Sequence, residues 1–147
     1  MRKSLDKANS GYVLAFDYGL KNIGVAIGQA LSCSASELEQ IQARDGTPNW
    51  DTLAKLLEEW KPDRAIVGLP LNMDGSDSEM SKRARKFGNR LHGRFGIEVN
   101  MVDERLSTRE AKERAQQQGH KGNYGQKPID SLAACILLED WWSQSQA

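Results

Sequence analysis

An uninterrupted apolar run in the middle of the chain, residues 65–69, is closed by Pro70. A run of this kind is typical of a strand that is buried on both faces, with neighbouring strands beside it and helices above and below. Two further apolar runs, 12–16 and 23–27, lie on either side of a turn containing Gly19, a spacing that predicts a β-hairpin. The chain therefore has to build a sheet that helices cover on both faces.

Between the hairpin and the buried strand, apolar residues recur at spacings of three and four, the period of an amphipathic helix. These residues are Trp50, Leu53, Leu57 and Trp60. We interpret Thr47 and Pro48 as the N-cap and first turn of this helix. Segment 38–43 alternates weakly between apolar and polar residues and is interpreted as a third strand.

The second half of the chain alternates strands and helices. A helix is predicted over 77–95, a strand over 97–102 and, after a capping box that starts at Ser107, another helix to about residue 118. Pro128 opens the last helix, which has a wide apolar face. The resulting order, β-β-β-α-β-α-β-α-α, predicts an α/β protein whose mixed sheet begins with antiparallel strands.

Length and composition indicate one globular domain. The 147 residues suit a single core, which we place at 11–147 after a flexible N-terminal extension at 1–10. The mean hydropathy of −0.62 excludes a membrane protein, and we predict a cytoplasmic location. Cys33 and Cys135 have no metal-binding spacing and are interpreted as reduced, structural cysteines.

The charges balance overall but are segregated along the chain. Basic and acidic residues number 20 each, yet six basic residues and no acid lie between positions 81 and 94. Four of them recur every four residues as a stripe beside the apolar helix face: Lys82, Lys86, Arg90 and Arg94. A solvated helix face is the commoner meaning of such a run, but no acid alternates with these bases, so we favour phosphate binding. Loop 68–75, which leads into this helix, is a second candidate because its backbone N–H groups are placed to meet a phosphate.

Three acidic residues lie where predicted elements end or begin. Asp17 ends the first strand, Glu104 follows a later strand and Asp130 falls in the first turn of the last helix. Ligands of open α/β sheets bind at the carboxyl edge, and carboxylates that meet there need a cation such as Mg²⁺ or Mn²⁺. Each residue also has a simpler interpretation. Asp17 suits a turn cap, Glu104 a surface ion pair with Arg105 or Arg109, and Asp130 the dipole of its helix.

Four segments, in order along the chain, resemble the signatures of a known family. They read FDYGLKNIGVA (16–26), VGLPLNMDG (67–75), DERLST (103–108) and DSLAA (130–134). The family is YqgF, also called RuvX or the Holliday-junction-resolvase-like family, within the ribonuclease-H-like superfamily. The resemblance covers about residues 12–142, nearly the whole predicted domain.

This resemblance implies a ribonuclease-H-like fold with a five-stranded mixed sheet, strands one to three antiparallel, flanked by helices. It implies that Asp17, Glu104 and Asp130 are catalytic metal ligands in a nuclease that matures the 5′ end of pre-16S rRNA. Related junction resolvases usually carry a further acid near the last ligand, whereas small or hydroxyl-bearing residues surround Asp130 here. We therefore expect one or two Mg²⁺ or Mn²⁺ ions.

The expected partner is structured RNA, such as pre-16S rRNA on ribosomal particles, or branched DNA, bound by a monomer or weak homodimer. The predicted nucleic-acid contacts are Lys21, Lys82, Lys86, Arg90, Arg94 and Arg105. Tyr18 suits stacking on a base and packing in the core equally well.

Three alternative functions share features of this sequence. A Holliday junction endonuclease requires two active sites and favours an obligate dimer. A non-catalytic RNA-binding factor for ribosome assembly or transcription has no use for the three acids. An ATP-dependent phosphotransferase shares the strand-Asp-x-Gly turn, but 147 residues leave no room for the second domain that closes over a nucleotide.

Overall fold

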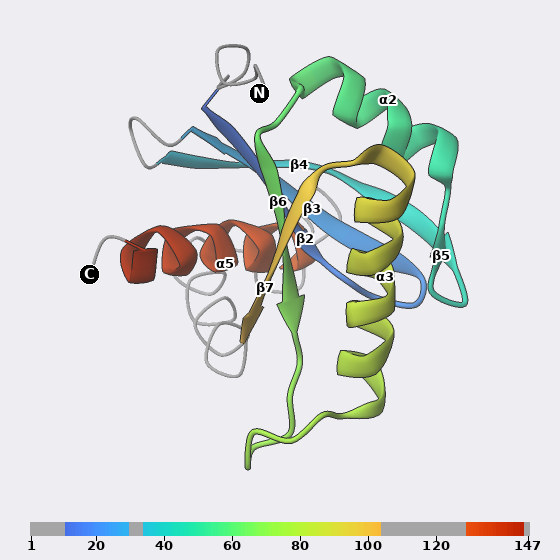
Figure 1. Cartoon of the computed structure of the whole chain (residues 1–147), viewed down its shortest axis with the longest axis vertical. Coiled ribbons are helices and arrows are strands. Elements are labelled where there is room, and N and C mark those ends of the chain that lie inside the picture. The colour runs from blue at the N-terminus through green and yellow to red at the C-terminus, as the bar shows by residue number, and fades with distance from the viewer. Residues whose placement is uncertain (1–10, 30–33, 104–128, 146–147) are drawn as a thin grey trace.

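The computed structural model describes residues 11–29, 34–103 and 129–145 (Figure 1). Its strands, in chain order, are β2 (Tyr12–Asp17), β3 (Asn22–Gln29), β4 (Ser34–Arg44), β5 (Thr47–Pro48), β6 (Arg64–Leu69) and β7 (Glu98–Asp103). Its helices are α2 (Trp50–Trp60), α3 (Glu79–Phe95) and α5 (Ile129–Ser145). The predicted extension at 1–10 and the predicted helix after Ser107 lie outside the described residues.

The described strands form one mixed sheet in the order β5-β4-β3-β2-β6-β7. β2, β3 and β4 are antiparallel neighbours, whereas β6 runs parallel to β2 and β7 runs parallel to β6. This confirms the predicted mixed sheet with its first three strands antiparallel. β6, which contains the uninterrupted apolar run, lies between two parallel neighbours. Parallel strands are typically covered on both faces, which explains why this run is apolar throughout.

The prediction for Thr47 and Pro48 was wrong. They form β5, which pairs with the end of β4 and gives the described sheet six strands instead of the expected five. A proline is tolerated there because an edge strand does not need every N–H as a donor. Helix α2 begins one residue later. Its N-cap is Asn49, whose side-chain oxygen accepts hydrogen bonds from the backbone N–H groups of Asp51 and Thr52 at 3.1 and 3.2 Å.

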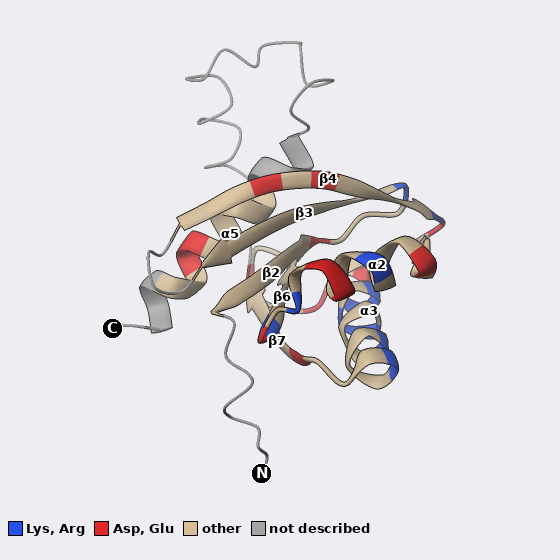
Figure 2. Cartoon of the chain, turned by 90° about the horizontal axis from the view of Figure 1, so that it is seen from above, with Lys and Arg blue, Asp and Glu red and all other residues tan. Residues whose placement is uncertain are grey.

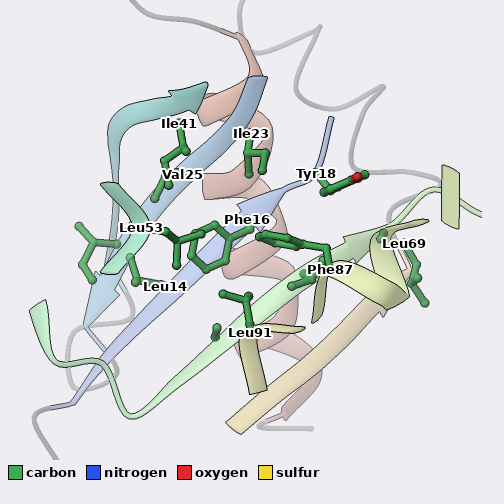
Figure 3. Packing of buried hydrophobic residues seen from close by; sticks show 14 residues of the cluster. Leu14, Phe16, Tyr18, Ile23, Val25, Ile41, Leu53, Leu69, Phe87 and Leu91 are labelled. Atoms are coloured by element: carbon green, nitrogen blue, oxygen red, sulfur yellow. The ribbon is translucent and has the colours of Figure 1, made fainter. Parts of the chain in front are cut away.

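Helices cover both faces of the sheet, which is why nearly all residues of β2, β3 and β6 are buried whichever way they point (Figures 1 and 2). One face of the sheet packs against α2 and α3, through Leu14, Phe16, Val67, Leu53, Phe87 and Leu91 (Figure 3). The other face packs against α5, through Val13, Ala15, Ile66, Ala134, Leu137 and Leu138. Cys135 is buried in this second cluster, which agrees with the predicted structural role. Among the described helices, none has the length and apolar character needed to cross a membrane.

The start of α3 is fixed by side chains that precede it. Ser78 and Ser81 form a capping box, in which each hydroxyl accepts a hydrogen bond from the other residue's backbone N–H, at 3.0 and 2.8 Å. The Ser81 hydroxyl also donates to Asp77 Oδ1 at 2.8 Å, and Arg85 Nε lies 3.2 Å from the same oxygen. The hydrogen bond from Ser81, together with Arg85, lowers the pKa of Asp77. The first turn of α3 is therefore anchored to the loop before it.

Helix α5 approaches β3 so closely at Gly28 that an added Cβ would overlap the Trp142 ring. We expect Gly28→Ala to lower the free energy of unfolding by about 1–3 kcal/mol, because the helix must move away from the sheet. The matched control is Gly93→Ala, where an added Cβ meets no atom within 4 Å on the exposed side of α3. This change should raise the free energy of unfolding by about 0.5–1 kcal/mol. Urea unfolding curves of both variants test the packing, which is contradicted if the two midpoints shift in the same direction.

Candidate active-site edge and nucleic-acid groove

The parallel strands β2, β6 and β7 end at the same edge of the sheet, and an acidic residue closes the strand on either side of β6. Phe16 of β2 pairs with Val67 of β6, and Leu69 of β6 pairs with Asp103 of β7. Asp17 and Asp103 therefore flank the end of β6. Asp17 is half-buried and Asp103 is exposed. Two carboxylates thus lie at the edge where α/β sheets bind ligands.

The other two predicted metal ligands are described less completely. Glu104 follows Asp103 directly and lies outside the described residues. Asp130 lies in the first turn of α5, as predicted, with its side chain outside the described set. Within the described part of the chain, no group of three or more His, Cys, Asp and Glu side chains could hold a metal ion. The convergence of Asp17, Glu104 and Asp130 therefore stays a prediction.

The turn that follows Asp17 is held by the turn between β4 and β5. The hydroxyl of Tyr18 donates a buried hydrogen bond to the carbonyl of Gly46 at 2.8 Å, and Gly46 N donates to the carbonyl of Leu20 at 2.9 Å. The exposed Lys21, a predicted nucleic-acid contact, receives a hydrogen bond from Ala43 N at its backbone carbonyl, at 2.7 Å. Three hydrogen bonds thus fix the segment that begins one residue after Asp17.

The structure supports the packing role of Tyr18 over base stacking. Tyr18 is 9% exposed, and its ring centroid lies 5.2 Å from that of Phe87. Gly46, which accepts the hydrogen bond from Tyr18, was not among the residues singled out from the sequence. The dipeptide Asp45-Gly46 was nevertheless a recognisable signal, because it is typical of tight hairpin turns. Both residues have positive φ, 48° and 83°. Glycine is required at position 46, because an added Cβ would overlap the Tyr18 hydroxyl.

Two of the six basic residues of α3 are committed to ion pairs within the protein. Arg83 Nη1 lies 3.6 Å from Asp45 Oδ1 and so connects α3 to the β4–β5 turn. Arg85 Nε lies 3.2 Å from Asp77 Oδ1. Their acidic partners are outside the basic segment, so spacing within that segment does not reveal them. These two residues stabilise local structure, which separates them from the predicted stripe.

The predicted stripe divides into two parts. The guanidinium of Arg94 lies 4.1 Å from the centroid of the Trp50 ring, a cation–π contact that binds α3 to α2. Lys82, Lys86 and Arg90 are exposed and form no salt bridge with any residue of the described ranges. Their charges therefore face solvent on one side of α3, where Figure 2 shows basic residues gathered along the helix.

These three side chains line a groove of about 400 Å³ between α3 and the β4–β5 turn. The opposite wall is formed by residues 45–48, and Tyr18 also lines the groove. The groove therefore begins at the residue that follows Asp17. A surface groove with an exposed row of cations on one wall suits the backbone of a nucleic acid.

The charge of the groove is positive. Its basic lining residues are Lys82, Arg83, Lys86 and Arg90, and its acidic ones are Asp45 and Glu79. Asp45 is already paired with Arg83, so the remaining cations outnumber the remaining acid. An anionic ligand is favoured in such a groove.

Three backbone N–H groups of loop 68–75, the second predicted phosphate site, form hydrogen bonds within the loop. Leu71 N donates to the carbonyl of Leu69, Asn72 N to that of Ser76, and Gly75 N to that of Asn72, at 2.8–2.9 Å. These N–H groups form hydrogen bonds with carbonyl groups at residues 69–76, because the chain reverses direction there and brings its own donors and acceptors together.

Comparison with known proteins decides the family. The family model described as "RuvX: Holliday junction resolvase" matches residues 11–144. The chain belongs to the RuvX family. This confirms the predicted family and the predicted enzyme class, a nuclease that hydrolyses phosphodiester bonds.

Several RuvX relatives are similar over nearly their whole length. A chain of Saccharophagus degradans named "Putative pre-16S rRNA nuclease" is 60% identical over 132 residues, which is 90% of this chain and 93% of that one. A chain of Escherichia coli O157:H7 with the same name is 53% identical over 135 residues, covering 92% of this chain and 98% of that one.

Two solved structures have the same fold at low sequence identity. Thermus thermophilus RuvC in complex with a Holliday junction substrate superposes with a TM-score of 0.56 at 14% identity, covering 92% of this chain and 96% of that one. Fowlpox virus resolvase in complex with Holliday junction DNA superposes with a TM-score of 0.58 at 16% identity, covering 92% of this chain and 99% of that one. These likenesses confirm the predicted ribonuclease-H-like fold.

Proposed function

We propose that this chain is a divalent-metal-dependent nuclease that trims the 5′ end of pre-16S rRNA in the cytoplasm, on ribosomal particles. The observation that carries the proposal is the continuity of the acidic edge with the cationic groove. Asp17 closes β2 at the edge, and the next residue, Tyr18, lines the groove. A nucleic-acid backbone that follows the groove therefore reaches the carboxylate directly. The choice of RNA rests on the names of the similar relatives.

The metal ligands in this proposal are Asp17, Glu104 and Asp130. Carboxylate oxygens are hard donors that suit Mg²⁺ and Mn²⁺, so the donor set fits such an ion. When bound, the ion activates a water and stabilises the leaving oxygen. The protein supplies a rigid support, since Asp17 of β2 pairs with Gly24 of β3 and its backbone is held in the sheet.

The direction of α5 supports the inclusion of Asp130. The C-terminal part of α5 lies at the amino ends of β2 and β6. Trp142 contacts Gly28, which pairs with Val13 of β2, and the Trp141 ring centroid lies 5.6 Å from the guanidinium of Arg64, the first residue of β6. From these contacts to its first turn the helix extends about 18 Å, at about 1.5 Å per residue. A helix that crosses the sheet from this end carries its first turn toward the opposite end, where Asp17 lies.

The basic residues hold the substrate by its phosphates and carry no base preference. Lys82, Lys86 and Arg90 bind phosphates along the groove, and Lys21 binds one beside the edge. Arg94 contributes through its charge while its guanidinium stays over Trp50. Arg105, outside the described residues, is assigned to the same set because it follows Glu104.

A second candidate is a Holliday junction endonuclease, favoured by the description of the family and by the two junction-bound structures. Junction cleavage cuts two strands and needs two active sites, so it requires a stable dimer. RNA trimming requires only a monomer or a weak homodimer. A non-catalytic RNA-binding factor keeps the groove but gains nothing from the acidic edge.

The purified chain, incubated with precursor 16S rRNA, mature 16S rRNA and a four-way DNA junction, with and without Mn²⁺, tests these candidates. We expect Mn²⁺-dependent shortening of the precursor at its 5′ end, and no symmetric cleavage of the junction. Symmetric junction cleavage by a dimer supports the second candidate instead. Binding of RNA without cleavage in either metal condition supports the non-catalytic factor.

A further inference from the structure

The loop between β6 and α3, residues 70–78, projects beyond the carboxyl edge of the sheet. Figure 1 shows the chain leaving β6, turning at a point far from the sheet and returning to α3. β6 ends between Asp17 of β2 and Asp103 of β7. The 70–78 loop therefore rises directly beside the acidic edge, and a nucleic acid bound at that edge has to pass it.

Hydrogen bonds stiffen the 70–78 loop along its length. At its base, the Ser78 hydroxyl donates to the carbonyl of Pro70 at 2.6 Å. In its middle, Asn72 N donates to the carbonyl of Ser76 at 2.9 Å, and Asn72 Nδ2 donates to the Ser76 hydroxyl at 3.1 Å. Near its tip, Asp74 Oδ1 accepts from both the backbone N–H and the hydroxyl of Ser76, at 2.9 and 2.6 Å. The tip is thus connected to the rest of the loop by several internal hydrogen bonds.

The tip carries an exposed apolar side chain. Met73 is 81% exposed and lies between Asn72 and Asp74 in the turn. Single exposed apolar residues are common on protein surfaces and need no function. In the described ranges, however, the exposed large hydrophobic residues are Met73 and Leu20, and Leu20 is in the turn after Asp17 on the neighbouring strand. Both therefore follow the carboxyl ends of adjacent parallel strands, next to the candidate site.

The chemistry of the tip suits a base better than a phosphate. Backbone N–H groups of residues 71, 72, 75 and 76 are consumed within the loop, and the charged group beside Met73 is the carboxylate of Asp74, which repels phosphates. Base faces are uncharged, and methionine is among the apolar residues that proteins insert between bases. Its flexible, polarisable thioether adapts to any base.

We propose that Met73, at the tip of the 70–78 loop, contacts the face of an unpaired base beside the cleaved bond. The preferred substrate is then a nucleic acid with an unpaired or easily unstacked base at the cleavage site, and a continuous duplex is a poor one. This inference rests on the proposed function, which places the cleaved bond at the acidic edge.

Two RNAs of equal length and charge test the proposal, one fully paired and one with an unpaired 2-aminopurine at the cleavage site. The parent protein should bind the unpaired substrate more tightly and change its 2-aminopurine fluorescence. Met73→Ala should weaken binding to this RNA by about tenfold, because the apolar contact between the thioether side chain and one base is lost. Its affinity for the paired RNA, the salt dependence of binding and its melting temperature should equal those of the parent. Met73→Leu, which keeps an apolar side chain, is the matched control and should behave as the parent.

The outcomes separate this inference from the proposed function. Suppose that the parent cleaves RNA, and that Met73→Ala gives the same fluorescence change as the parent and binds each RNA with the parent's affinity. The inference about Met73 then fails and the nuclease assignment stands. If Met73→Ala binds both naked RNAs normally but binds ribosomal particles weakly, the tip contacts a protein and the inference is overturned. If the parent neither binds nor cleaves any nucleic acid, the proposed function itself fails.

Discussion

Asp17→Asn is expected to reduce the cleavage rate by about 10³-fold or more, because the substitution removes a charged metal ligand and metal positioning is the chemistry. The thermal stability of the fold should not decrease. In the proposed site Asp17 is repelled by two further carboxylates when no metal is bound, so removing its charge relieves strain. The variant should therefore melt at the same or a higher temperature than the parent without metal, and should lose the stabilisation that Mn²⁺ gives the parent. Cleavage rates and thermal unfolding with and without Mn²⁺ measure both effects.

The matched control is Asp103→Asn, which removes a carboxylate from the same edge of the sheet but not from the proposed ligand set. We expect its cleavage rate to stay within about tenfold of the parent rate, since a neighbouring charge affects the site only through space. The nuclease assignment loses its central residue if Asp17→Asn melts markedly earlier than the parent while keeping its cleavage rate. In that case Asp17 is a turn-forming residue.

Reversing the charges of Lys86 and Arg90 together should weaken RNA binding at low salt by at least about tenfold, because two phosphate contacts become repulsive. The slope of log K against log salt concentration should become shallower by about 1.4–1.8, and the loss should be similar for all RNA sequences. Filter-binding titrations at several salt concentrations provide both values.

Each of the two substitutions, Lys86→Glu and Arg90→Glu, is also made singly. The matched control for these single variants is Lys55→Glu, an equal charge change at an exposed position on α2. This control should leave the salt slope at the parent value, since Lys55 does not line the groove. Equal slopes for the parent and the double variant would mean that the basic stripe is only a solvated helix face.

The parts of the fold that depend on burial were predictable from the sequence. Segment 65–69 is apolar throughout because both of its faces are covered, and this pattern alone predicts β6 and its neighbours. The interpretation of Thr47 and Pro48 failed because Thr-Pro also suits a helix start, and only pairing with β4 decides between the two. Asn49, a good N-cap residue one position further on, was the local signal for the true helix start.

Some residues of the candidate site could be predicted because the direction of a strand determines their position. Others could not, because their position depends on contacts with residues far away in the sequence. Asp17 lies at the carboxyl edge because a strand ends there, which the apolar run before it already indicates. The division of the basic stripe was not predictable, since Arg83 pairs with Asp45 and Arg94 with Trp50, partners that only the folded chain brings near. The same holds for the hydrogen bond from Tyr18 to Gly46, which joins residues 28 positions apart.

The most direct test of the acidic edge as the nuclease metal site is a crystal structure of the protein soaked in Mn²⁺, with the ion located by anomalous scattering. We predict an anomalous peak at the carboxyl ends of β2 and β7, within about 2.5 Å of side-chain oxygens of Asp17, Glu104 and Asp130. A structure in which Glu104 or Asp130 points to another edge of the sheet, or in which Mn²⁺ binds without Asp17, would contradict this prediction.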